Sequence, residues 1–197
     1  MHYILKCHHL TNLSLRKKRV CDKINVVNLL HRNKEEVITL PNKYIAFVYQ
    51  DVYKEDFDCS EFLCRLKMQK LIYLILQMGI NIGEYNFSWY KHGPYSQQLQ
   101  NDMLSMAPVV SAKGNLQYSR RAKDAVRQVS ESLQKPKGSP YGSADWAECI
   151  ASIHYLKKYI MPQDANEEDT IYELEKQKQH LNDHNSNEIA YEKASMI

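Results

Sequence analysis

One apolar segment at helical spacing, residues 59–78 (CSEFLCRLKMQKLIYLILQM), constrains the fold of this chain more than any other feature. Its apolar residues recur every three or four positions, whereas Lys67 and Lys70 lie three apart, on or near its more polar side. Ser60 can cap the start of a helix here, and Gly79 is a plausible stop signal. The pattern therefore predicts an amphipathic helix that packs into a globular core.

A strand, a tight turn and a second helix are predicted directly after this helix. Residues 85–90 (YNFSWY) alternate aromatic and polar side chains, which is typical of a strand. Gly93 permits unusual backbone φ angles in the turn, and Pro94 fits the first turn of a helix that Ser96 caps. We expect this corner to serve mainly the fold. The side chains of Lys91 and His92 should be exposed, and the neighbouring tyrosines partly buried.

A hairpin, a basic helix and a linker follow. Residues 109–119 (VVSAKGNLQYS) are typical of two short strands around a turn at 113–115. Ser119 can then cap an amphipathic helix, SRRAKDAVRQVSESL, with apolar residues on one face. Residues 134–144 are rich in Pro, Gly and Ser and lack apolar periodicity, which indicates a linker before further C-terminal helices.

The order helix, strand, helix, hairpin, helix is the layout of a winged-helix unit. The sequence therefore predicts a mainly α fold with a small β-hairpin, in which a winged-helix-like core is followed by C-terminal helices. The predicted organisation is a basic, partly structured N-terminal extension (1–57), the core (58–134), a linker (135–144) and a C-terminal helical region (145–197). Winged-helix units bind nucleic acid or dock proteins, so this fold leaves both functions open.

Charge is distributed unevenly along the 197 residues. Residues 1–50 hold nine Lys and Arg against three Asp and Glu, whereas residues 151–197 hold five against nine. A basic arm can bind nucleic acid or an acidic partner, but such charges also serve solubility alone.

The apolar segments are shorter than the roughly 20 residues of a membrane span. Without a secretory signal, and with five cysteines, we expect a cytoplasmic protein with free thiols.

Metal-binding and catalytic patterns are weak. Cys59 and Cys64 are five apart, unlike the paired spacing of zinc sites, and the Cys7-His8-His9 run lacks a clear second pair. Cys149 and His154 face about 140° apart on one helix, and a triad of Ser96, His92 and Asp102 has no mark of an activated serine. We therefore expect no enzyme activity, cofactor or metal.

Two groups of residues are candidates for partner or nucleic-acid binding. Lys91, His92 and Tyr95 lie at the corner, where a strand end and a helix start would favour an anionic partner. Four basic residues surround the apolar stripe of the later helix and would contact phosphates more than bases: Arg120, Arg121, Lys123 and Arg127. The alternatives, a corner that only shapes the fold and a helix face that is only solvated, stay open.

The central segment resembles a known family. RLKMQKLIYLILQMGINIGEYNFSWYKHGPYSQQLQNDM (65–103) is similar to the shared segment of Panacea-domain proteins, the SocA-like antitoxins, and of the related YwgA-like uncharacterised proteins. GNLQYSRRAKDAV and WAECIASIHYLKKYI look like that family's hairpin, following helix and C-terminal helix, so the resemblance spans about residues 60–192. It implies a non-enzymatic protein of antitoxin or mobile-element and defence regulator type that binds a protein partner, such as a toxin encoded nearby. The alternative is a nucleic-acid-binding transcriptional regulator.

Overall fold

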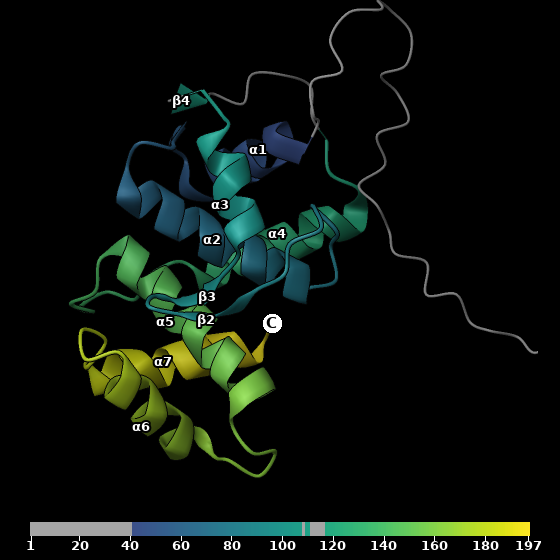
Figure 1. Cartoon of the computed structure of the whole chain (residues 1–197). Helices are drawn as coiled ribbons and strands as arrows, with labels where there is room; N and C mark the ends of the chain where they lie inside the picture. The colour runs from purple at the N-terminus through teal and green to yellow at the C-terminus, as the bar shows by residue number, and fades with distance from the viewer. Residues whose placement is uncertain (1–40, 108, 111–116) are drawn as a thin grey trace, which may run out of the picture.

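A computed structural model describes residues 41–107, 109–110 and 117–197 of the chain. Over these residues the protein is mainly helical, with a small antiparallel β-hairpin, which confirms the predicted fold class (Figure 1). The helices are α1 (Pro41–Tyr53), α2 (Phe62–Gln77), α3 (Gln97–Leu104), α4 (Arg120–Ser132), α5 (Ser143–Tyr155), the π-helical turn η1 (Leu156–Ile160), α6 (Glu167–Gln177) and α7 (His184–Ser195). The strands are β1 (Phe57–Asp58), β2 (Ser88–Tyr90), β3 (Gly93–Tyr95) and β4 (Val109–Val110).

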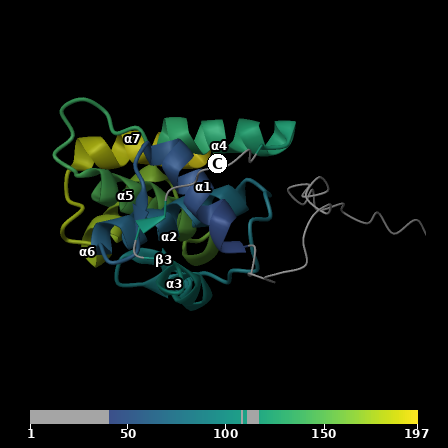
Figure 2. The same ribbon diagram turned by 90° about the horizontal axis from the view of Figure 1, so that it is seen from above.

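Helix α2 lies at the centre of the molecule, because α1, α3, α4 and α5 all pack against it (Figures 1 and 2). Every residue from Leu66 to Ile75 is buried. The helix predicted at 59–78 is thus confirmed, but two details differ. Ser60 does not cap it, since its hydroxyl donates to Asp58 Oδ1 instead. Its polar side is also absent, because even Lys67 and Lys70 are buried.

The hairpin of β2 and β3 sits between α2 and α5, with Ser88 paired to Tyr95 and Tyr90 paired to Gly93. The strand predicted at 85–90 is therefore shorter than expected. Pro94 belongs to β3 and not to the first turn of a helix, because α3 begins at Gln97. The predicted cap is confirmed, since Ser96 Oγ accepts a hydrogen bond from Leu99 N.

The hairpin predicted at 109–119 lies mostly outside the described residues, because 111–116 are not described. Val109 and Val110, which are described, pair antiparallel with Asp58 and Phe57 of β1. Helix α4 then begins as predicted, with Ser119 Oγ accepting a hydrogen bond from Ala122 N at 3.2 Å.

The core runs through the whole described chain. One cluster of buried apolar residues extends from Ile45 in α1 to Ala194 in α7, and Trp146 of α5 is fully buried within it. Figure 2 shows α7 beside α4, and the two helices are in contact. In the sequence they lie on opposite sides of the segment predicted as a linker, residues 135–144. That segment contains no helix from 134 to 142, and its Tyr141 is anchored by a hydrogen bond to Asn187. No helix among the described residues is long and apolar enough to cross a membrane.

Candidate functional site

The candidate site is the corner at 90–96, which two buried side chains of α2 hold in place. The Gln69 amide donates to the carbonyl of Ser96 and accepts from its N–H, both at 2.9 Å. Lys70 Nζ donates to the carbonyl of Pro94 at 2.8 Å. Burial lowers the pKa of Lys70 to about 7, against the opposing field of Glu148. Helix α2 thus fixes the backbone that follows the turn.

A third buried side chain fixes the backbone before the turn. Lys178, at the end of α6, donates through Nζ to the carbonyls of Tyr90 at 2.7 Å and Lys91 at 2.6 Å. The same ammonium lies 4.5 Å from the centre of the Trp89 ring, close enough for a cation–π contact. Burial lowers the pKa of Lys178 as well. The turn is therefore held from two sides, by the centre of the core and by the C-terminal helices.

Gly93 is required where the turn touches α5. Its φ is +76°, a conformation that side-chain-bearing residues rarely adopt, and a Cβ would lie 2.2 Å from Ser152 Oγ. Ser152 is fully buried, and its hydroxyl has no hydrogen-bond partner among the described residues. The expectation that glycine shapes this corner is thus consistent with its position against α5.

His92 points inward to a buried carboxylate. Its Nδ1 lies 2.9 Å from Oε2 of Glu148, a residue of α5 that is fully buried. His180, between α6 and α7, places its Nε2 3.1 Å from Oε1 of the same carboxylate. The predicted exposure of His92 is therefore wrong in part, because its side chain is only 31% exposed. Lys91 is exposed as predicted.

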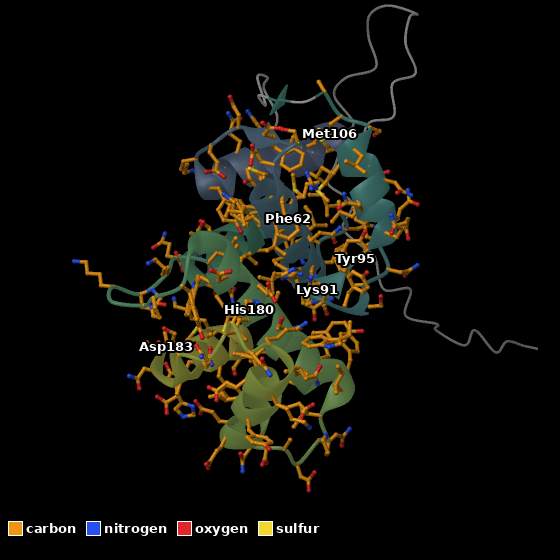
Figure 3. All side chains as sticks on the ribbon, turned by 60° about the vertical axis from the view of Figure 1, so that its left-hand side comes forward. Phe62, Lys91, Tyr95, Met106, His180 and Asp183 are labelled. Carbon is orange, nitrogen blue, oxygen red and sulfur yellow. The ribbon has the colours of Figure 1, made fainter. Side chains whose placement is uncertain are left out.

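The outer face of the corner is aromatic. The side chains of Phe62, Tyr90, His92 and Tyr95 line a hollow of about 170 Å³, whose inner end is formed partly by Lys70. Phe62 is 51% exposed and Tyr90 is 63% exposed, so the prediction of a partly buried tyrosine holds for Tyr95 but not for Tyr90. The centres of the Tyr90 and Tyr95 rings lie 5.3 Å apart, with the ring planes tilted by 37°. In Figure 3 the labelled Phe62, Tyr95, Lys91 and His180 lie around the middle of the molecule, between α2 and the C-terminal helices.

The basic residues of α4 do not contribute to this hollow, whose lining comes from α2, the β2–β3 hairpin and α3. All four predicted basic residues of α4 are exposed: Arg120, Arg121, Lys123 and Arg127. The charge of Arg127 is partly neutralised by two carboxylates of the same helix. Its Nη1 lies 3.2 Å from Oε1 of Glu131, and its Nη2 lies 4.0 Å from Oδ1 of Asp124. The two groups of candidate residues therefore form separate surfaces.

A second, larger hollow of about 480 Å³ lies over the loop that joins α2 to β2. Tyr73, Phe87, Tyr155 and Tyr159 supply aromatic walls, and Glu84 is a carboxylate at its edge. The hydroxyl of Tyr73 lies 2.8 Å from Nδ1 of His154. Burial lowers the pKa of His154 to about 4. This histidine is neutral near pH 7 and serves as a hydrogen-bond partner within the core.

The side chains considered for catalysis have other partners in the described structure. Asp102 accepts a hydrogen bond from Tyr85 OH at 2.8 Å, and Ser96 is occupied as a cap. Cys149 Sγ lies 3.2 Å from Asn187 Oδ1, and burial raises the pKa of its thiol. The structure does not bring the residues of either suggested constellation together.

Glu148, His180, Lys70, Lys178 and Gln69 were not recognised from the sequence as site residues. Their spacing gives no signal, because they come from α2, α5 and the segment after α6. A weaker signal exists in Lys70 and Glu148. Each has apolar residues three or four positions away on its helix, and charged residues are rarely buried unless they have partners.

Comparisons of the chain with protein-family models, with curated proteins and with solved structures find no match.

Proposed function

We propose that this chain is a non-enzymatic interaction protein that binds a protein partner, of the antitoxin or mobile-element and defence regulator type implied by the sequence resemblance. The observation that carries the proposal is the aromatic rim around the hollow at the hairpin corner, formed by the exposed Phe62 and Tyr90 and the partly buried Tyr95. Hereafter this surface is called the corner surface.

The size and composition of the corner surface favour a macromolecular partner over a small molecule. Small-molecule sites typically enclose about 300–1,000 Å³, whereas this hollow of about 170 Å³ is suited to a single inserted side chain. Tyrosine and arginine are enriched among residues that dominate protein interfaces, and Arg65 lines the hollow beside the tyrosines. The corner surface therefore offers an anchor pocket with an aromatic rim.

The backbone of the corner surface is held in one conformation before any partner binds. Gln69, Lys70 and Lys178 together make five hydrogen bonds to the backbone of Tyr90, Lys91, Pro94 and Ser96. A surface that is ordered in advance loses less conformational entropy on association. This supports recognition by preformed shape.

Nucleic-acid binding by a regulator is the second candidate, favoured by the exposed Arg120 and Lys123 of α4. Binding to DNA should then weaken steeply as salt rises, because each neutralised phosphate releases counterions. An Arg120→Ala, Lys123→Ala chain should show a smaller salt dependence. If the unaltered chain fails to bind DNA even at low salt, this second function is excluded.

Affinity purification of the tagged full chain from its host tests the first proposal. We expect at least one protein that the unaltered chain and Tyr172→Ala retain and that Phe62→Ala, Tyr90→Ala loses. Tyr172 is a matched control, because it is an aromatic residue of α6 with 67% exposure and lies outside the corner surface. The proposal is contradicted if every captured protein is retained equally by all three chains.

A further inference from the structure

Three residues from distant parts of the sequence converge beneath the corner surface. His92 lies in the β2–β3 turn, Glu148 lies on α5, and His180 lies between α6 and α7. One ligand atom from each residue lies within 4.8 Å of the other two. Two imidazoles and one carboxylate form a common ligand set for zinc and related metals.

The distances between the Glu148 carboxylate and each imidazole nitrogen are close to those in a metal site. In a tetrahedral zinc site, bonds of about 2.0–2.2 Å place neighbouring ligand atoms about 3.3 Å apart. His92 Nδ1 lies 2.9 Å from Oε2 of Glu148, and His180 Nε2 lies 3.1 Å from Oε1 of the same carboxylate. The two imidazole rings meet edge to face, with centres 5.8 Å apart. Rotation of the two imidazoles, which are both accessible to solvent in part, would direct both nitrogens to a shared ion.

Burial and charge also fit a bound cation. The Glu148 side chain is fully buried, whereas those of His92 and His180 are 31% and 43% exposed, so the cluster opens towards solvent on the histidine side. A buried carboxylate requires compensating positive charge, which a metal ion held between the two imidazoles would supply.

Lys70 and Lys178 also interact electrostatically with Glu148, but their hydrogen bonds go to backbone carbonyls of the hairpin. Lys70 Nζ donates to Pro94 O, and Lys178 Nζ donates to two carbonyls of the turn. Among the hydrogen bonds of the described residues, the Glu148 oxygens have only the two imidazoles as partners. The nearby ammonium charges would weaken the binding of a dication without occupying its position.

We propose that His92, Glu148 and His180 bind a divalent transition-metal ion of the zinc class through Nδ1, a carboxylate oxygen and Nε2. Water completes the coordination on the solvent side, as in zinc sites with three protein ligands. The ion would link the hairpin turn, α5 and the segment between α6 and α7. This inference does not depend on the identity of any protein partner.

A Co²⁺ titration of the full chain, followed by displacement with Zn²⁺, tests the site. Cys7→Ser, His8→Asn and His9→Asn form the background, because these residues offer competing ligands near the N-terminus. We expect one equivalent of Co²⁺ with visible absorption bands, which Zn²⁺ abolishes. His180→Asn should raise the Kd for Zn²⁺ at least tenfold, since loss of even an indirect ligand contact costs about 10–100-fold.

His184→Asn is the matched control. His184 is 55% exposed and pairs with Glu175 and Glu188, but it lies outside the cluster, so its loss should leave the Kd unchanged. His92→Asn should behave like His180→Asn. If His92→Asn does not fold, by circular dichroism, His180→Asn alone decides. The proposal is wrong if the background chain shows no saturable binding or if His180→Asn binds Zn²⁺ as tightly as His184→Asn does.

Discussion

At the scale of single residues, Gly93 is the position where the corner leaves no room for a side chain. Gly93→Ala should destabilise the protein through both its positive φ and the overlap with Ser152 Oγ. Gly138→Ala isolates the first effect, because Gly138 has φ +87° and nothing within 4 Å of its added Cβ. Placing a residue with a Cβ at a positive φ alone should lower the unfolding free energy by about 1–2 kcal/mol.

Urea unfolding measures both glycine variants. We expect a clearly larger loss of unfolding free energy for Gly93→Ala than for Gly138→Ala, since only the former must displace the Ser152 hydroxyl. Equal losses would show that Ser152 accommodates the added methyl group without cost.

Lys70 makes stability depend on pH at the same scale. Its folded pKa of about 7 lies below its ordinary value of 10.5, so the unfolded chain holds a proton that the folded chain releases between these values. Stability therefore rises as pH increases from about 7 towards 10.5, and the charged form costs stability below that window. From pH 7 to pH 9 the gain is on the order of 2 kcal/mol.

Urea unfolding at pH 7 and pH 9, with Lys70→Met as the comparison, checks this dependence. Between pH 7 and pH 9, the unfolding free energy of the unaltered chain should rise relative to that of Lys70→Met by on the order of 2 kcal/mol. Subtracting the variant removes the contribution of Lys178, whose pKa is also lowered. A difference that does not change with pH contradicts the account of Lys70.

At the scale of elements, the hairpin depends on Lys178, at the end of α6, which lies more than 80 residues away in the sequence. Lys178→Met removes the donor to the Tyr90 and Lys91 carbonyls. We expect faster hydrogen exchange in the β2–β3 hairpin and little change in α3, which Gln69 and Ser96 hold separately. Lys176→Met is the control, because Lys176 is exposed and its ion pair in the described structure is with Glu173 on its own helix. Equal exchange in both variants would remove Lys178 as an anchor.

Elements with local signals could be predicted from the sequence, and those set by distant contacts could not. Helical periodicity predicted α2, and hydroxyl caps predicted the starts of α3 and α4. The buried state of Lys70 and the pairing of Val109 and Val110 with β1 depend on contacts across the fold. Of the candidate site, the sequence could place Lys91, His92 and Tyr95 together in one turn, whereas Glu148 and His180 approach His92 only in three dimensions.

At the scale of the whole molecule, the shared core predicts a single cooperative unfolding transition. Apolar residues of α1, α2, α5 and α7 belong to one buried cluster, so no described helix has a core of its own. Helical circular dichroism and the fluorescence of Trp89 and Trp146 should therefore change at the same urea concentration. Two separated transitions would instead support independent core and C-terminal domains.

The corner surface as a protein contact is the central claim, and site-specific photo-crosslinking in the host tests it most directly. Benzoylphenylalanine is placed at Tyr90, on the corner surface, and in a second chain at Tyr172, on α6. Both side chains are similarly exposed, at 63% and 67%, so both variants should fold. We expect a discrete crosslinked protein from position 90 and none from position 172. No adduct from position 90, or the same adduct from both positions, would contradict the claim.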